Sequence, residues 1–189
     1  MNGLIEAAAE LQAFLRERGW RFCFIGGIAL QRWGEPRVTC DVDATLLTGL
    51  GEEERYVEKL LSHFEARRPD AADFALRNRV LLLRAGNGAA IDLALGGFPF
   101  EERMVGRASE VDFGSGVRLV LCSAEDLVIL KAFAARLQDW ADVKRILARQ
   151  RGHLDWGYID EQLPPLCELK GEPEIVDRLQ DLRNEIANE

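Results

Sequence analysis

Two aspartates separated by a single residue, Asp41 and Asp43, lie in an otherwise apolar stretch that is typical of a β-strand. Residues two apart on a strand point to the same face, so the two carboxylates stand side by side. Like charges in such a place repel each other and are costly unless a cation lies between them. We therefore interpret the pair as ligands of a divalent metal ion. The alternative is a pair of solvated acids on an edge strand, where charges discourage aggregation.

A third acid, Asp92, extends this candidate site. It follows the hairpin signal Asn87-Gly88 on a predicted return strand, where Ala90 and Ala94 share its face and leave room beside it. Three carboxylates with open coordination positions suit Mg²⁺ (or Mn²⁺) bound together with the phosphates of an NTP. Metals held in this way stabilise the attacking and leaving oxygens of a phosphoryl displacement. The alternative for Asp92 alone is a surface acid on a hairpin.

A glycine pair, Gly26 and Gly27, follows a short apolar run and precedes a short helical pattern. Because glycine has no side chain, backbone amides at the start of a helix can approach an anion closely. No Gly-Lys-Ser or Gly-Lys-Thr follows, so the pair is not part of a P-loop. We expect both glycines to bind the triphosphate of the substrate.

The spacing of apolar residues predicts the elements that position these side chains. Helices are predicted over residues 4–18, 28–33, 52–65, 99–103, 124–137, 139–149, 156–163 and 172–187. Strands are predicted over 21–25, 40–47, 80–84, 89–95, 108–113 and 117–122. The segment 67–77 is predicted to be irregular. Pro164-Pro165 is predicted to end the helix of residues 156–163. This order predicts an α/β (α+β) fold with a mixed sheet flanked by helices in a core of residues 1–122, and a helical region of residues 123–189 packed on that core.

The composition, with 48% hydrophobic and 30% charged residues, is that of a globular protein. A net charge of −8 argues against coating of nucleic acid through charge alone. No apolar run reaches the roughly 18 residues of a membrane span, and no signal peptide is evident, so we expect a cytoplasmic protein without a membrane partner. The scattered cysteines contain no CxxC pair, and we expect reduced core residues at Cys23, Cys40, Cys122 and Cys167.

An ordered set of these residues resembles a known active-site motif. It comprises Gly26-Gly27-x-Ala29, Gly34-x-Pro36-Arg37-x-Thr39 and Asp41-Val42-Asp43. This set resembles the DNA polymerase β-type nucleotidyltransferase superfamily, and more narrowly the AbiEii-type nucleotidyltransferases of type IV toxin–antitoxin systems. The later pattern Ser123-x-Glu125-Asp126-Leu127-x-x-x-Lys131, followed by Arg136-x-x-Asp139-x-x-Asp142, agrees with it. Gly27 departs from the many superfamily members that have a serine there, and thus lacks a hydroxyl for the phosphate.

The resemblance implies roles for residues of both parts of the chain. Asp41, Asp43 and Asp92 would be catalytic metal ligands, with Asp92 also a candidate base toward the acceptor. Lys131 would contact the triphosphate, and Asp142, with Asp139 as a further candidate, would complete the site. The alternatives are a solvated helix lysine for Lys131 and a helix cap for Asp139. For Arg37, the sequence leaves open whether it anchors the loop or meets a phosphate.

The resulting hypothesis is a Mg²⁺-dependent nucleotidyltransferase that transfers NMP from an NTP to a tRNA or protein hydroxyl, as a toxin-like component with an antitoxin partner. One alternative is a catalytically silent binding module or antitoxin with the same fold. Another is transfer to a small molecule such as an aminoglycoside, since an acidic protein attracts a cationic acceptor.

Overall fold

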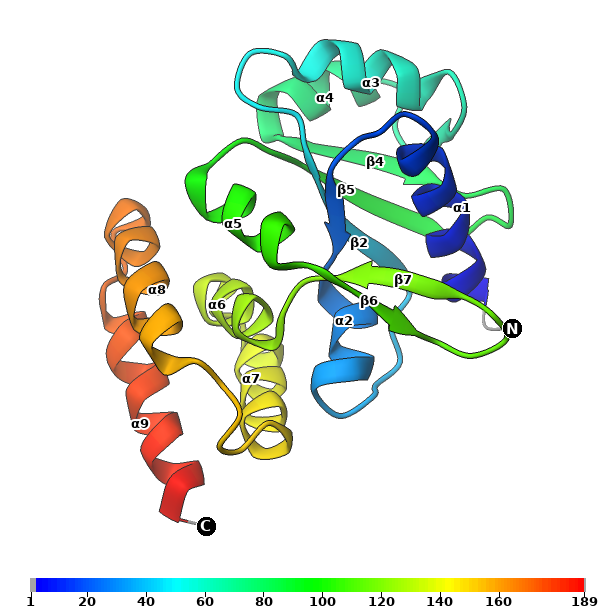
Figure 1. The fold of residues 1–189 in the computed structure, drawn as a ribbon. Helices are drawn as coiled ribbons and strands as arrows, with labels where there is room; N and C mark the ends of the chain where they lie inside the picture. The colour runs from blue at the N-terminus through cyan, green and yellow to red at the C-terminus, as the bar shows by residue number, and fades with distance from the viewer. Residues whose placement is uncertain (1–2, 189) are drawn as a thin grey trace. The chain divides into compact units, whose positions relative to one another are not determined.

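The computed structural model describes residues 3–188. Its helices are α1 (Gly3–Glu17), α2 (Gly26–Trp33), α3 (Glu53–Leu61), α4 (Ala71–Asn78), α5 (Pro99–Arg107), α6 (Ala124–Ala134), α7 (Leu137–Arg149), α8 (Trp156–Lys170) and α9 (Glu174–Asn188). Its strands are β1 (Phe22–Phe24), β2 (Asp41–Leu47), β3 (Glu65–Ala66), β4 (Val80–Arg84), β5 (Ala90–Gly96), β6 (Ser109–Asp112) and β7 (Arg118–Leu121). Figure 1 shows these elements along the chain.

The chain divides into two compact units. The first contains the residues up to Ile28 together with Val38–Cys122, and the second contains Ala29–Arg37 and the residues from Ser123 onward. The helix α2 therefore begins in the first unit and ends in the second. The division into domains at residue 122 stays a prediction. The compact units differ from that division in residues 29–37, which belong to the second unit and not to the first.

The first unit is built on one mixed sheet with the strand order β3-β4-β5-β2-β1-β7-β6. Its parallel pairs are β2 with β5 and β1 with β7, and the other neighbouring strands are antiparallel. The hairpin predicted at Asn87-Gly88 is confirmed, because Arg84 of β4 pairs with Ala90 of β5. The predicted class, a mixed sheet with helices around it, is therefore what the chain adopts.

The two faces of the central strands differ in character. On one face, alternate residues of β2, β4 and β5 are fully buried in a core with α1, α3 and α4, as period-two patterning requires. Figure 1 shows α3 and α4 side by side next to β4, in agreement with their contacts. On the other face, most of the intervening residues of the same strands are half-buried, and this face carries the acids.

The second unit consists mainly of four helices, of which α6 contacts α7, α8 and α9. The helix α6 begins at the predicted N-cap, where Ser123 Oγ accepts a hydrogen bond from the Asp126 amide and the Asp126 side chain accepts in return. It ends three residues earlier than predicted, since Ala135 adopts a left-handed conformation with φ of 58°. This cap lets the chain turn directly into α7.

Several predictions about local structure and burial are wrong. The segment 67–77 is not irregular throughout, because it contains most of α4, whose buried stripe consists of the alanines Ala71 and Ala75 and gives a weak apolar signal. The turn predicted over 99–103 continues as α5 to Arg107. Cys40 is exposed and is not a core residue, whereas the other three cysteines are buried.

Pro164 and Pro165 do not end their helix, contrary to prediction, and α8 continues to Lys170. The two missing amides leave the carbonyls of Asp160 and Glu161 without their helical partners, but both of these residues are exposed, so water can bond to them. The buried residues of α8 lie before and after the prolines, and its packing on α6 and α9 supports the whole length. Tertiary packing therefore outweighs the helix-breaking tendency of the two prolines.

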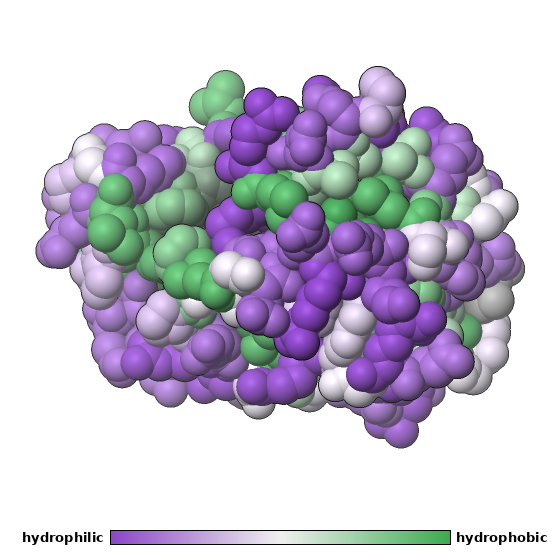
Figure 2. Space-filling view, turned by 90° about the horizontal axis from the view of Figure 1, so that it is seen from above, coloured by the Kyte–Doolittle hydropathy of each residue, from purple (hydrophilic) through white to green (hydrophobic). Residues whose placement is uncertain are grey.

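Among residues 3–188, no helix is both long enough and apolar enough to cross a membrane. Figure 2 shows a face on which hydrophilic residues predominate, with hydrophobic residues gathered in patches between them.

Candidate active site

Three carboxylates meet on the half-buried face of the first unit's sheet. Asp41 and Asp43 belong to β2, and Asp92 of β5 is the register partner of Asp43 in the parallel pair. One oxygen from each of the three lies within 4.8 Å of the others. These are the three acids that the sequence analysis proposed as one site. The structure brings them together although their two strands are almost 50 residues apart in the chain.

Thr39 and Arg67 are among the side chains that donate hydrogen bonds to these acids. The Thr39 hydroxyl donates to Asp41 Oδ1 at 3.2 Å, and Arg67 Nη1 donates to Asp92 Oδ1 at 2.6 Å. The Arg67 guanidinium offsets one of the three formal negative charges that these carboxylates carry if all are ionised. A divalent cation bound there would offset negative charge in the same way.

The donor set fits Mg²⁺ or Mn²⁺. Carboxylate oxygens are hard ligands, and Mg²⁺ is commonly held by one or two carboxylates, with waters and substrate phosphates as its other ligands. Opposite oxygens around a Mg²⁺ ion lie about 4.2 Å apart, a little less than the 4.8 Å limit that contains the three oxygens here. The spacing of the three oxygens of Asp41, Asp43 and Asp92 is therefore close to that of oxygens around a single ion.

The glycine pair lies directly against the acidic strand and the loop before it. Gly26 has φ of +57°, and a Cβ at this position would lie 1.9 Å from Asp43 Oδ2. A Cβ at Gly27 would lie 2.3 Å from Thr39 Oγ1. Glycine is thus required at both positions because the side chains of the acidic segment occupy the space that a Cβ would need. The binding of triphosphate by this pair stays a prediction.

Lys131 and Asp142 lie in the second unit, where they form a buried charge cluster with Asp139. Lys131 Nζ lies 2.8 Å from Asp139 Oδ1 and 3.0 Å from Asp142 Oδ2. Asp139 and Asp142 are 1% and 0% exposed. Arg37 donates from Nε and Nη2 to the Asp142 carboxylate at 3.1 to 3.3 Å. Arg37 therefore anchors its loop to α7, one of the two roles that the sequence left open.

Asp139 does not cap its helix, since α7 begins at Leu137 and its N-cap is Arg136. Burial raises the pKa of the Asp139 carboxyl, but hydrogen bonds from Arg136 and Lys131 outweigh it, and the pKa lies below its ordinary value. Lys131 is likewise no solvated helix lysine, because its side chain is 9% exposed. The cluster has a structural role within the second unit, and contacts of Lys131 or Asp142 with a nucleotide stay predictions.

Sequence reasoning missed Arg67, which lies in the segment predicted to be irregular. Its amide donates to the carbonyl of Leu82 at 3.0 Å, which extends the β3–β4 pairing by one residue. Leu82 is in turn the register partner of Asp92. No local pattern could reveal this arrangement, because it depends on the lateral order of three strands.

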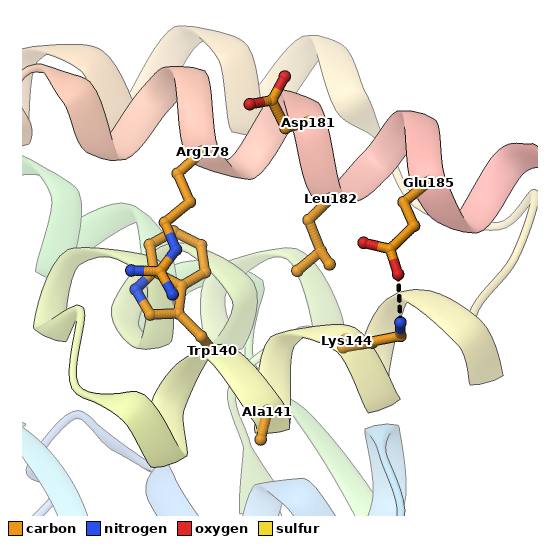
Figure 3. A pocket seen from close by; sticks show the side chains of 7 residues that line it. All are labelled: Trp140, Ala141, Lys144, Arg178, Asp181, Leu182 and Glu185. Carbon is orange, nitrogen blue, oxygen red and sulfur yellow. Dashed lines mark hydrogen bonds and ion pairs between the residues drawn. The ribbon is translucent and has the colours of Figure 1, made fainter.

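The second unit also contains a hollow of about 390 Å³ between α7 and α9 (Figure 3). The Arg178 guanidinium lies over the Trp140 ring, 4.4 Å from its centre, and Lys144 forms an ion pair with Glu185. Trp140 Nε1 is buried and has no hydrogen-bond partner among the described residues. Since this nitrogen is buried, it does not present a donor to the hollow.

A scan against protein-family models gives no match, and a search of curated protein sequences finds no similar one. Solved structures of similar fold include an antigenic nucleotidyltransferase-like protein from Paracoccidioides brasiliensis. It is 15% identical with a TM-score of 0.53, over 94% of this chain and 92% of that one. The lincosamide antibiotic adenylyltransferase LnuA is 12% identical with a TM-score of 0.48, over 72% and 91%. The antibiotic-resistance factor ANT(2'')-Ia is 19% identical with a TM-score of 0.45, over 97% and 91%. The first of these likenesses shows that the chain has a nucleotidyltransferase-like fold.

Proposed function

We propose that this protein is a nucleotidyltransferase that uses Mg²⁺ or Mn²⁺ to transfer NMP from an NTP to an acceptor hydroxyl. The observation that carries the proposal is the cluster of Asp41, Asp43 and Asp92 on one face of a sheet with a nucleotidyltransferase-like fold. Three half-buried acids within one ion's reach are hard to explain as a stabilising feature, since like charges at this distance repel one another.

The proposed reaction forms a bond between the acceptor oxygen and the α-phosphorus of the NTP. The bond from that phosphorus to the oxygen bridging toward the β-phosphate breaks, and pyrophosphate leaves with the electron pair. Asp92 is the proposed base that takes the acceptor proton. Asp41, Asp43 and Asp92 would hold the metal, which when bound supplies positive charge opposite the phosphate oxygens. Gly26 and Gly27 would present backbone amides at the start of α2 to the triphosphate.

The narrower parts of the proposal concern the acceptor and the biological role. We infer a tRNA or protein hydroxyl as the acceptor, and a toxin-like component with an antitoxin partner, from the motif resemblance to AbiEii-type proteins. Contacts of Lys131 and Asp142 with the nucleotide belong to the same inference.

Isothermal titration with ATP and the other NTPs, with and without Mg²⁺, tests the metal and nucleotide assignments. Wild-type protein is expected to bind an NTP only when the metal is present, and Asp41→Ala with Asp43→Ala is expected to abolish binding. Asp73→Ala is a control, because Asp73 is an exposed acid of the same unit that forms an ion pair with Arg77 of its own helix. Equal binding by wild type and the double variant would refute the metal assignment.

Transfer itself is tested by incubation of the protein with labelled NTPs and a bacterial lysate. Metal-dependent labelling of RNA or protein that disappears in Asp43→Ala supports the enzyme and names the acceptor class. Labelling of an added aminoglycoside instead would replace the macromolecular acceptor by a small molecule. Silence with all four NTPs, together with a retained partner on pull-down, would favour the binding module.

A further inference from the structure

The Arg67–Asp92 ion pair places a cation of this chain on one of the three acids. Arg67 and Asp92 belong to segments on either side of β4, so their Cα atoms are about 10 Å apart at the ordinary strand spacing. The Arg67 side chain must therefore extend over Leu82, the half-buried residue between them, to reach Asp92 Oδ1 at 2.6 Å. A side chain that crosses a strand to reach one carboxylate is a specific arrangement.

The surroundings of this pair argue against a merely stabilising role. The side chains of Arg67 and Asp92 are 23% and 32% exposed, and pairs this accessible to water contribute little to folding. The same carboxylate also belongs to the acid cluster, where its oxygen is within 4.8 Å of oxygens of Asp41 and Asp43. A carboxylate that already accepts a charged hydrogen bond, here from Arg67, is a weaker ligand for a second cation because the two positive charges repel.

We propose that Arg67 is the resident counter-ion of Asp92, and that a divalent cation enters the acid cluster by displacing it. The inference rests on the proposed metal site and adds a positioning residue to it. In the metal-free protein, Arg67 holds the Asp92 carboxylate beside Asp43 and offsets part of the repulsion among the acids. When a cation takes Asp92, the guanidinium turns away and becomes available to an anionic group of the substrate.

Mn²⁺ alone is the probe, because its electron paramagnetic resonance signal measures free ion without any catalysis. Arg67→Met keeps an unbranched apolar stem over Leu82 and removes the charge, so Mn²⁺ is expected to bind about tenfold more tightly. Arg67→Lys keeps a positive charge near Asp92 and should bind Mn²⁺ within about threefold of wild type. Arg68→Met is the matched control, since the next residue pairs with Asp70 in an exposed ion pair and removing it changes the net charge equally.

The outcomes separate this inference from the proposed function. Tighter binding by Arg67→Met alone, with unchanged far-UV circular dichroism, supports displacement. Unchanged or weaker binding by Arg67→Met, in a protein whose wild type binds Mn²⁺, overturns the role of Arg67 and leaves the metal site standing. Equal tightening by Arg67→Met and Arg68→Met also overturns it, because the effect would then be one of net charge. Absence of Mn²⁺ binding in wild type and in every variant overturns the metal site together with this inference.

Discussion

Replacing Gly26 by alanine is expected to damage both the stability and the metal site of this protein. The left-handed backbone at Gly26 costs an alanine about 1–2 kcal/mol. The new Cβ would also lie 1.9 Å from Asp43 Oδ2 and 2.6 Å from Asp43 Cγ. Relief requires Asp43 to leave its rotamer or the strand to shift, which adds about 1–3 kcal/mol. The free energy of unfolding should therefore fall by about 2–5 kcal/mol in total.

Gly19→Ala isolates the backbone contribution. Gly19 has φ of +65°, close to that of Gly26, but among the described residues no atom beyond its chain neighbours lies within 4 Å of its added Cβ. This control should lose only about 1–2 kcal/mol in urea unfolding. It should also keep the Mn²⁺ affinity of wild type, whereas Gly26→Ala should weaken Mn²⁺ binding at least tenfold because the displaced Asp43 carboxylate no longer faces Asp92.

A double variant, Gly26→Ala with Asp43→Ala, tests whether the loss of stability comes from the clash with Asp43. Asp43→Ala removes the two atoms nearest to the new Cβ and leaves the Asp43 Cβ at 2.7 Å. The stability loss from Gly26→Ala should therefore be smaller in the Asp43→Ala background than in wild type. The reasoning is refuted if Gly26→Ala costs no more than Gly19→Ala and leaves Mn²⁺ binding unchanged.

Three further predictions concern the second unit. Lys131→Met should lower the free energy of unfolding by about 3–5 kcal/mol, because two buried carboxylates lose their shared ammonium; a loss below about 1 kcal/mol in urea unfolding would contradict the structural role of this lysine. The lowered pKa of Asp139 means that its contribution to stability is complete above the ordinary value of 3.8 and is lost as the pH falls through the folded-state value. Unfolding measured from pH 5 down to pH 2 should show a shallower acid decline in Asp139→Asn than in wild type, and parallel curves would refute the ion pair. Pro165→Ala should raise the unfolding free energy by about 1–3 kcal/mol, seen as a higher Tm, because it restores a helical donor to the carbonyl of Glu161; a lower Tm would show that the proline ring contributes packing to α8.

The predictions that were correct depend on the local periodicity of the sequence. The two-residue spacing of Asp41 and Asp43 placed both on one face, and Asn87-Gly88 placed Asp92 on the strand after a hairpin. The predictions that failed depended on neighbours far away in the sequence. The alanine stripe of α4 is recognisable as a buried face only because α4 packs against α3 and β4. The helix α8 continues through its two prolines because it packs against other helices.

Residue type and spacing by themselves were enough to predict the class of fold and to select Asp41, Asp43 and Asp92 as the candidate acids of the site. Only the tertiary structure decided that β2 and β5 are parallel, in the register that sets Asp43 beside Asp92. It also showed that Gly26 is a glycine because Asp43 packs against it, and that Arg67 reaches Asp92 across β4. The physical reason is the same in each case. Periodicity along one strand fixes which face a side chain takes, whereas lateral order and register depend on contacts between residues that are distant in the chain.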